Sequence, residues 1–371
     1  MIETKEPALD PRVRHAAEQG AWIVFNLSGG KDSSAAAFAA SIWLDRIGHP
    51  RGRRVAIHAD LGAIEWRSTP DMLRSICDRL EVELIVVHRA AGGLIERWEQ
   101  RFEAGKQRYA ALETYTLIGP WSSAKLRFCT SELKSHIIER ELRRRFGAGQ
   151  FVSIVGLRRD ESSARAKTPI VKDGSAGLVW HPLVEWSADD VFALHRRHAL
   201  PLHEAYVRWG ASRMGCSFCV LSCERNLGAS ARAPSNLPAY LGLVELEARS
   251  TFSFQPTRWL GEVAPALLPG QLREMLRDGM AAATHRRAAE ASLPADLRYE
   301  KGWPPRIPTL AEAATISRVR SVILSQHSLS SPYETAAAVR DRFAELHQRK
   351  QRAANDSGMT ERPAVFARGR Q

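Results

Sequence analysis

The sequence predicts an α/β protein with a doubly wound parallel sheet and a mainly helical C-terminal appendix. From residue 21 to about residue 160, short β-rich runs alternate with segments of helical periodicity, which is typical of parallel strands joined by crossover helices. Beyond about residue 185 the strand signals fade and helical segments dominate. The chain has 371 residues, of which 44% are hydrophobic, and this ordinary globular composition allows two or three domains.

The predicted strands and helices follow one another along the first half of the chain. Buried strands are expected at residues 21–27, 55–60, 83–88 and 151–155, and helices at about residues 32–46, 66–80 and 131–145. A glycine-rich turn separates the first strand from the first helix. Because ligands bind outside the carboxyl ends of parallel strands, the loops after the four strands are the expected places for chemistry.

The expected organisation of the chain has four parts. They are an N-terminal extension (1–20), an α/β domain that contains a cysteine cluster (21–224), a helical C-terminal region (225–350) and a disordered basic tail (351–371). The tail is assigned because its residues are polar, Arg-bearing and aperiodic.

The balance of charges favours an anionic partner. The chain carries 53 Lys and Arg residues against 41 Asp and Glu residues, so its formal net charge is +12. Such an excess supplies the sequence-independent part of nucleic-acid affinity, although a generally Arg-rich composition would give the same charge without that partner. We find neither a run of ~20 apolar residues nor a signal-peptide pattern, and we therefore expect a cytoplasmic protein with no membrane partner.

The turn after the first strand has the composition of a phosphate-binding loop. It reads Ser28-Gly29-Gly30-Lys31-Asp32-Ser33-Ser34. Two glycines let the backbone curl around a phosphate, the lysine supplies a positive charge, and the serines supply hydroxyl donors beside the N-terminus of a helix. The spacings of the Walker A and the G-x-G-x-x-G motifs are both absent from this loop.

The first six residues of this turn resemble the PP-loop of the ATP pyrophosphatase superfamily, whose fold is adenine nucleotide alpha hydrolase-like. That superfamily includes phosphoadenylylsulfate (PAPS) reductases, ATP sulfurylase small subunits, tRNA thiolation enzymes and DNA-phosphorothioation proteins. The resemblance implies that residues 21–224 bind a nucleotide. It implies that the loop holds the pyrophosphate of ATP, with Mg²⁺, or the phosphosulfate end of PAPS. The reaction usual in the superfamily is attack on the α-phosphate with release of pyrophosphate.

Two further segments resemble the PAPS reductase-like family. Residues 127–134, RFCTSELK, are similar to its R-x-C-T-x-x-L-K segment, and residues 156–165, GLRRDESSAR, to its G-x-R-x-x-E-S-x-x-R segment. The second match implies that Gly156 and Glu161 belong to the nucleotide site and that Arg158 and Arg165 bind phosphate or sulfonate oxygens. A solvated run of charges is the alternative. The matches occur in the family's order and cover residues 22 to about 225.

Asp60 ends the second predicted strand. The resemblance implies that this strand end lies beside the adenosine, where the carboxylate accepts a hydrogen bond from a hydroxyl or helps to hold Mg²⁺. A solvated turn aspartate is the alternative.

Four of the five cysteines suggest a metal centre. Cys216, Cys219 and Cys223 have the spacing C-x₂-C-x₃-C, and Cys129 can supply a fourth thiolate from the active-site side of the sheet. Thiolates at this spacing suit a [4Fe–4S] cluster or, alternatively, a tetrahedral Zn²⁺. A redox dithiol, a persulfide relay and plain structural cysteines remain open, as does the choice between three and four ligands. Several PP-loop sulfur-transfer families carry a [4Fe–4S] cluster near the nucleotide, and the resemblance therefore favours the cluster.

Our first functional hypothesis is an ATP pyrophosphatase that adenylates an acceptor and lets a sulfur nucleophile displace AMP. Lys31, Asp32, Ser33, Arg158 and Arg165 are the expected catalytic residues. The first three belong to the loop that, with Mg²⁺, would stabilise the leaving pyrophosphate, and the two arginines would neutralise charge that develops on the phosphates or hold the acceptor. Given the basic charge, the favoured acceptor is nucleic acid, as in DNA phosphorothioation. The expected partners are DNA, a sulfur donor such as a cysteine desulfurase, and other proteins of a modification system.

Two alternatives are kept. One is a PAPS or adenylylsulfate reductase-like enzyme, in which a thiol attacks the sulfur of the sulfonucleotide. Against it, no cysteine follows Cys223 in this sequence, and Cys129 is followed by Thr130 and not by a second cysteine. The other alternative is a nucleic-acid-binding module whose loop only senses nucleotide and whose metal is structural.

Overall fold

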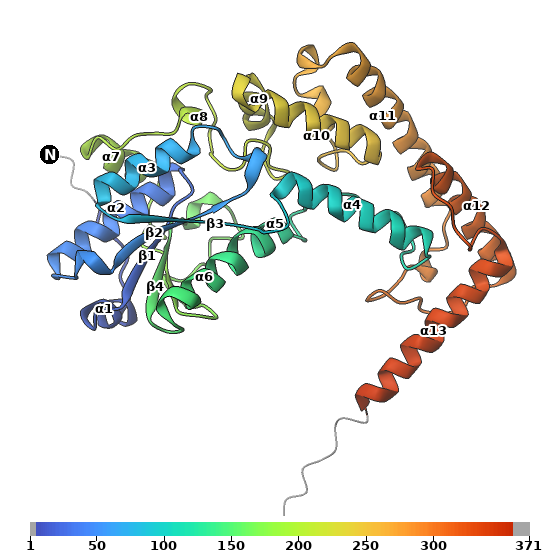
Figure 1. The fold of residues 1–371 in the computed structure, drawn as a ribbon, viewed down its shortest axis with the longest axis horizontal. Helices are drawn as coiled ribbons and strands as arrows, with labels where there is room; N and C mark the ends of the chain where they lie inside the picture. The colour runs from blue at the N-terminus through green and yellow to red at the C-terminus, as the bar shows by residue number, and fades with distance from the viewer. Residues whose placement is uncertain (1–4, 359–371) are drawn as a thin grey trace, which may run out of the picture. The chain divides into compact units, whose positions relative to one another are not determined.

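The computed structural model describes residues 5–358, which fall into two compact units (Figure 1). The first unit takes the described chain up to Trp98, then Trp121–Glu245 and Phe254–Pro269. The second takes Glu99–Pro120, Leu246–Ser253 and the chain from Gly270 onward.

The first unit is built on a six-stranded sheet with the strand order β3-β2-β1-β4-β6-β5. The strands are β1 (Trp22–Asn26), β2 (Arg54–Asp60), β3 (Glu83–His88), β4 (Phe151–Val155), β5 (Val171–Asp173) and β6 (Leu178–Trp180). All neighbours pair in parallel except β5 and β6, which are antiparallel. The predicted α/β class with a parallel sheet is therefore confirmed. The two strands that the sequence did not predict have three residues each, too few to show a period of two.

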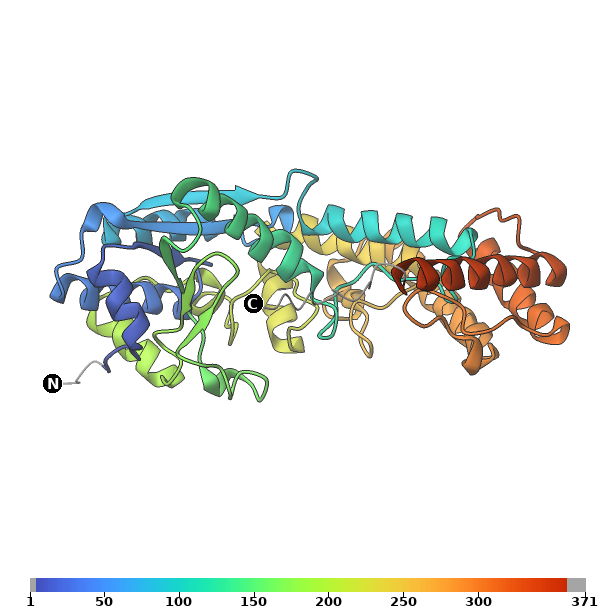
Figure 2. The ribbon, with the colours of Figure 1, turned by 90° about the horizontal axis from the view of Figure 1, so that it is seen from below.

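Helices cover both faces of this sheet (Figures 1 and 2). Ile23 and Phe25 of β1 pack into a core with the alanine-rich helix α2, whereas Val24 faces the core that includes Leu142 of α6. The three central residues of the strand, Ile23, Val24 and Phe25, are all apolar because both faces of the strand are buried. The helices are α1 (Pro11–Glu18), α2 (Lys31–Arg46), α3 (Thr69–Leu80), α4 (Leu94–Ala110), α5 (Phe128–Thr130), α6 (His136–Phe146), α7 (Ala188–Arg197), α8 (Glu204–Val207), α9 (Glu224–Arg232), α10 (Leu237–Ser250), α11 (Gly270–Ala291), α12 (Leu310–Gln326) and α13 (Ala336–Gly358).

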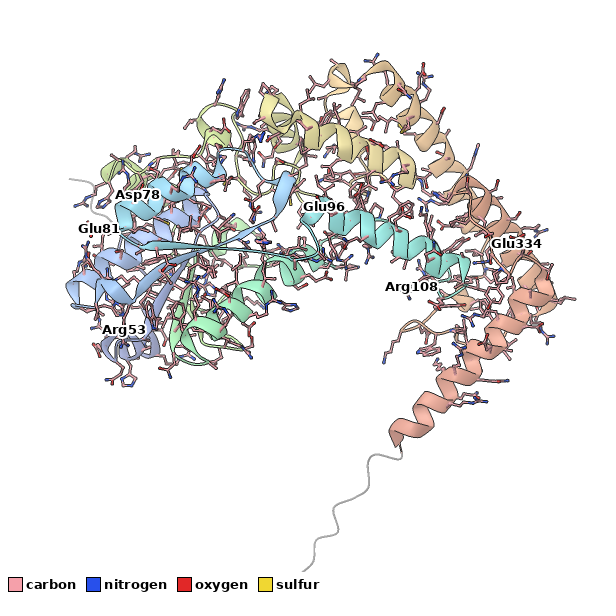
Figure 3. The ribbon with its side chains drawn as sticks, in the orientation of Figure 1. Arg53, Asp78, Glu81, Glu96, Arg108 and Glu334 are labelled. Carbon is pink, nitrogen blue, oxygen red and sulfur yellow. The ribbon has the colours of Figure 1, made fainter. Side chains whose placement is uncertain are left out.

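The second unit is helical and has its own apolar core. Leu112, Tyr115, Ile316 and Phe343 are buried together there. Arg320 of α12 is also buried, and its guanidinium donates to the backbone carbonyls of the segment that ends α4. The six charged residues labelled in Figure 3 are exposed, and they come from both units. None of the described helices is long and apolar enough to cross a membrane.

The two units divide the chain differently from the predicted domains. Residues 225–245 and 254–269, expected in the helical region, belong to the first unit, while residues 99–120 join the second. Helical periodicity shows that a helix has an apolar face but not which neighbour covers it. Helix α13 also continues to Gly358, inside the predicted tail of residues 351–371, and residues 359–371 lie outside the described part of the chain.

Candidate active site

The phosphate loop, Ser28–Ser34, connects the end of β1 to the first turn of α2. Gly29 has φ +76°, a conformation that favours glycine. The Ser33 hydroxyl donates to the Gly30 carbonyl at 2.9 Å and accepts from the Ser28 N–H at 3.2 Å, so the loop is closed by its own side chains. Gly30 is the N-cap of α2 and has no side-chain oxygen, so no side-chain cap covers this helix end, a suitable place for an anion.

Gly156, at the end of β4, lies directly against this turn. A Cβ atom at Gly156 would be 2.4 Å from the Asp32 carbonyl oxygen and 2.6 Å from the Ser33 nitrogen. Only glycine therefore allows the two backbones to approach so closely.

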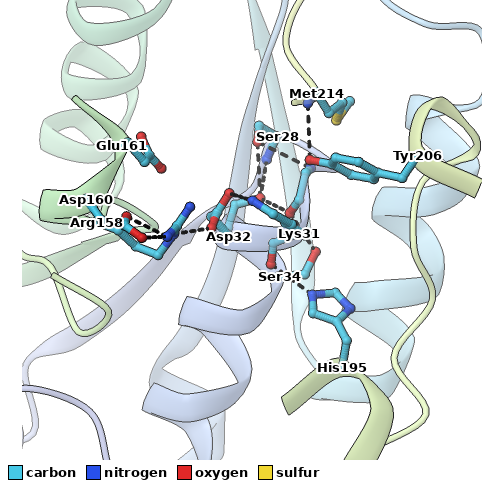
Figure 4. Close-up of polar contacts among 12 residues, drawn as sticks. Ser28, Lys31, Asp32, Ser34, Arg158, Asp160, Glu161, His195, Tyr206 and Met214 are labelled. Carbon is cyan, nitrogen blue, oxygen red and sulfur yellow. Dashed lines mark hydrogen bonds and ion pairs between the residues drawn. The ribbon is translucent and has the colours of Figure 1, made fainter. Parts of the chain in front are cut away.

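A chain of ion pairs fixes the start of α2 (Figure 4). Lys31 Nζ is 2.6 Å from Asp32 Oδ2, and Asp32 Oδ1 accepts from Arg158 Nε at 2.7 Å. Arg158 also donates to Asp160 at 2.5 Å. Because the Lys31 and Arg158 side chains are each only 6% exposed, Asp32 acts as the shared counter-charge of two buried cations. Three of the five expected catalytic residues, Lys31, Asp32 and Arg158, are thus brought together as one network.

A side chain of helix α7 also contacts the first turn of α2. His195 Nε2 donates to the Lys31 carbonyl at 2.9 Å, while its buried Nδ1 has no hydrogen-bond partner among the described residues. The sequence analysis missed His195, since one histidine on an apolar helix face gives no separate signal.

A cavity of about 540 Å³ extends along the sheet from its carboxyl edge, at Ser28 and His58, to the start of β4 at Phe151. Four predicted site residues line it: Ser28, Ser33, Gly156 and Cys216. The cavity wall also includes His58, Glu65, Thr130 and Lys134, none of which the sequence analysis chose as a site residue. Of the predicted residues, those outside the described wall are Gly29, Gly30, Lys31, Asp32, Ser34, Asp60, Arg158, Glu161, Arg165, Cys129, Cys219 and Cys223.

Asp60 has a local partner at the end of β2. Its Oδ1 accepts from the Gly62 N–H at 2.8 Å and so closes the turn that follows the strand. The carboxylate is used here in turn formation, which is the structural alternative considered above.

His58 and Glu65 form a pair on the cavity wall. His58 Nδ1 lies 2.9 Å from the Leu27 carbonyl oxygen, and Nε2 lies 3.0 Å from Glu65 Oε2. Burial acts to lower the pKa of His58, but the Glu65 carboxylate outweighs it and raises that pKa above its ordinary value. One feature of the sequence could have pointed to His58. Side chains alternate along a strand, so His58 lies on the same side of β2 as Asp60, a residue that was predicted for the site.

Arginines from three loops gather near the end of the phosphate loop. Burial, followed by the positive charges of Arg213 and Arg127, lowers the pKa of Arg165. Arg165 pairs with Glu161, whereas Arg127 and Arg213 have no carboxylate partner among the described residues. Like charges brought together in this way favour an anion between them.

The cysteine loop, residues 214–219, forms another part of the cavity wall. The pKa of the Cys216 thiol is raised to about 12, mainly by burial; Lys134 acts to lower it, while Cys219 and Cys129 are close enough to act in the raising direction. The loop is anchored by Ser217, whose N–H and Oγ both donate to the Ile64 carbonyl, at 2.9 Å and 2.7 Å.

Among the described residues, no group of three or more His, Cys, Asp or Glu side chains is placed to hold a metal ion. The metal centre on the four cysteines therefore stays a prediction. Cys223 is exposed at the N-cap of α9, whereas Cys216 lies in the cavity wall.

These features define an α/β protein with a glycine-rich loop and a thiol at the carboxyl edge of its sheet. The chain belongs to the phosphoadenosine phosphosulfate reductase domain family, whose model matches residues 22–221. The family resemblance drawn from the sequence motifs is therefore confirmed.

Two curated relatives match parts of the chain. An "Uncharacterized 37.8 kDa protein in gpa 5'region" of Escherichia phage 186 is 35% identical over 108 residues, which are 28% of this chain and 32% of the phage protein. The adenosine 5'-phosphosulfate reductase of Allochromatium vinosum is 32% identical over 142 residues, which are 37% of this chain and 52% of the reductase. The chain thus spans about a third and about a half of these relatives.

Solved structures with some similarity include a PAPS reductase from Candida auris in a phosphate complex, with a TM-score of 0.38 and 17% identity over 56% of this chain and 88% of that one. The U34-tRNA thiolase of Methanococcus maripaludis, solved with its [4Fe–4S] cluster, has a TM-score of 0.35 and 15% identity over 74% and 80% of the two chains. An NH₃-dependent NAD synthetase from Campylobacter jejuni has a TM-score of 0.33 and 13% identity over 74% and 89%.

Proposed function

We propose that this protein is an enzyme that binds an adenine nucleotide in the cavity and uses it in sulfur chemistry. The observation that carries the proposal is that two serines of the phosphate loop and the Cys216 thiol line the same cavity. A volume of about 540 Å³ lies in the range of small-molecule sites. A nucleotide whose phosphates lie at the N-terminus of α2 would therefore share the cavity with a thiol.

The favoured reaction is adenylation by ATP. An acceptor oxygen attacks the α-phosphorus, the bond to the β-phosphate oxygen breaks, and pyrophosphate leaves toward the phosphate loop. A sulfur nucleophile at the oxidation level of hydrosulfide then attacks the adenylated atom of the acceptor, and AMP leaves with the former acceptor oxygen. Cys216, which lines the cavity, is the candidate group for positioning that nucleophile through a hydrogen bond. Mg²⁺ would arrive bound to the phosphates of ATP, which is the usual way that this cation enters such sites. Lys31 and Arg158 add positive charge behind the loop.

The acceptor that we favour is nucleic acid, with DNA as the first choice. Support comes from the net charge of +12 and from Arg127 and Arg213, which have no carboxylate partner among the described residues. A sulfur donor such as a cysteine desulfurase, and other proteins of a modification system, complete the proposal.

Sulfonucleotide reduction is the second candidate, and the similarity to the Allochromatium vinosum reductase favours it. In that reaction the Cys216 thiolate attacks the sulfonate sulfur, the S–O bond to the nucleotide breaks, and a thiosulfonate forms on the cysteine. An added dithiol would then release sulfite and become oxidised to its disulfide.

One set of assays separates these candidates. Purified protein is given Mg·ATP, a DNA oligonucleotide and sulfide, and pyrophosphate is measured. In parallel it is given adenylylsulfate or PAPS with dithiothreitol, and sulfite is measured. Pyrophosphate release that survives in C216A, with sulfur incorporation lost, supports the first reaction. Sulfite release that is lost in C216A but kept in C223A, whose thiol is exposed, supports the second. Salt-sensitive DNA binding with neither product would overturn both and indicate a binding module.

A further inference from the structure

Three segments of the cavity wall are joined through His58. Its Nδ1 contacts the carbonyl of Leu27, the residue before the phosphate loop, at 2.9 Å. Its Nε2 contacts Glu65, in the turn after β2, at 3.0 Å. The neighbouring Ile64 carbonyl accepts the two hydrogen bonds from Ser217 that anchor the cysteine loop. A single side chain therefore links the phosphate loop to the segment that carries Cys216.

The hydrogen-bond partners of His58 determine how many protons the His58–Glu65 pair carries. The Leu27 carbonyl can only accept, so His58 Nδ1 carries a hydrogen. The contact between Nε2 and Glu65 Oε2 is a hydrogen bond only when one more proton lies between them. Without that proton, two lone pairs would face each other at 3.0 Å. Since the two side chains are only 7% and 16% exposed, water has little room to separate them.

Few charged groups surround the pair. Lys134, which precedes α6, faces His58 and acts against its protonation, while Glu65 favours it and has the larger effect. The charge of Glu65 also acts to raise the pKa of His203 and that of the Cys216 thiol, whereas Lys134 acts to lower the pKa of the same thiol. The partner from β1 is the uncharged Leu27 carbonyl. The net result is that the pKa of His58 lies above its ordinary value.

We propose that His58 and Glu65 form a proton-dependent clasp that positions the phosphate loop and the cysteine loop for nucleotide binding. His58 is a positioning residue in this account, because it acts through Leu27 and Glu65. The inference rests on the proposed function, since it takes the cavity to be the nucleotide site.

The direction of the pH dependence follows from the raised pKa of His58. A group whose folded pKa is raised contributes fully below its ordinary pKa, which for histidine is about 6.5. That contribution is lost as the pH rises through the raised value. Nucleotide affinity should therefore fall on the alkaline side. The expected fall is about tenfold, the usual effect of losing one charge-assisted hydrogen bond.

Glu65→Gln is the decisive variant. A glutamine amide N–H can donate to the bare Nε2 of neutral His58, so the contact is kept without the shared proton. The affinity for Mg·ATP is measured by calorimetry from pH 6 to pH 9.5 for the wild type and for E65Q. Ionisation of the nucleotide affects both proteins equally. We expect the wild type to lose affinity about tenfold, and E65Q to stay within about twofold of its own value.

Two further readouts do not need a nucleotide. NMR titration of the His58 ring should give a raised pKa in the wild type and a lower one in E65Q. Alkylation of Cys216, followed by mass spectrometry, should speed up with pH more steeply in the wild type than in E65Q. Parallel pH profiles of affinity in the two proteins, or a His58 pKa at or below its ordinary value, would overturn the clasp. If neither protein binds nucleotide, the proposed function fails, and the NMR and alkylation results then decide the clasp alone.

Discussion

The phosphate loop and the cysteine loop line the same cavity, but different interactions hold them. The phosphate loop is closed by hydrogen bonds among its own residues and is backed by the ion pairs of Asp32. The cysteine loop is held mainly from outside, by Ser217 on Ile64 and by the Tyr206 hydroxyl, which accepts from the Met214 N–H at 3.1 Å. We infer that the first loop is a rigid anion site, whereas the position of the thiol depends on neighbouring segments.

Removing the charge of Asp32 should damage the rigid loop most. Asp32→Asn leaves Lys31 and Arg158 buried without their shared carboxylate, and breaking a buried pair costs roughly 3–5 kcal/mol. Because Asp32 itself is 17% exposed, we expect the lower end, about 3 kcal/mol, in chemical denaturation. Asp160→Asn is the matched control, since that side chain is 47% exposed, and should cost below about 1 kcal/mol. Equal losses in the two variants would contradict the network.

Adding one methyl group against the phosphate loop and one within the cysteine loop tests the comparison directly. In Gly156→Ala the new Cβ meets the Asp32 carbonyl at 2.4 Å, so the first turn of α2 must shift, at a cost of about 1–3 kcal/mol. In Gly215→Ala, on the cysteine loop, the Cβ meets nothing within 4 Å. Thermal unfolding should therefore separate the two variants clearly. A Gly215→Ala protein as unstable as Gly156→Ala would show that the cysteine loop is also tightly constrained.

The alanines at residues 35–40 and the SGGKDS motif made β1, α2 and the loop between them predictable, because these features depend on neighbours in the sequence. Whether the four thiols converge on a metal could not be predicted from their spacing, because ligand convergence depends on where distant segments meet. His58 and Glu65 were missed for the same reason. The two side chains pair only because the turn after β2 brings Glu65 back beside His58, and no short sequence motif predicts that turn.

Loosening the cysteine loop should have a smaller effect on stability than on thiol reactivity. Ser217→Ala removes the 2.7 Å hydrogen bond to the Ile64 carbonyl, worth about 1 kcal/mol. We expect Cys216 to be alkylated several-fold faster, with nucleotide affinity nearly unchanged, as judged by mass spectrometry and calorimetry. Ser222→Ala, five residues further along the chain, serves as the control. An unchanged rate for Cys216 would mean that Ser217 does not hold the loop.

The smallest effect is expected at Cys223. Because its thiol is exposed and belongs to no metal group among the described residues, Cys223→Ala should change the free energy of unfolding by less than about 0.5 kcal/mol. Metal analysis of the wild type and the variant should give the same content. A loss of bound iron or zinc in C223A would show that the thiols do gather around a metal.

Protection of Cys216 by nucleotide tests most directly that the phosphate loop and the thiol share one site. Wild-type protein is alkylated at increasing concentrations of Mg·ATP and, separately, of adenylylsulfate, and each cysteine is followed by mass spectrometry. The account predicts that nucleotide slows labelling of Cys216, with half-protection at the dissociation constant measured by calorimetry, while the exposed Cys223 is labelled at an unchanged rate. Nucleotide binding that leaves the labelling of Cys216 unchanged would contradict it.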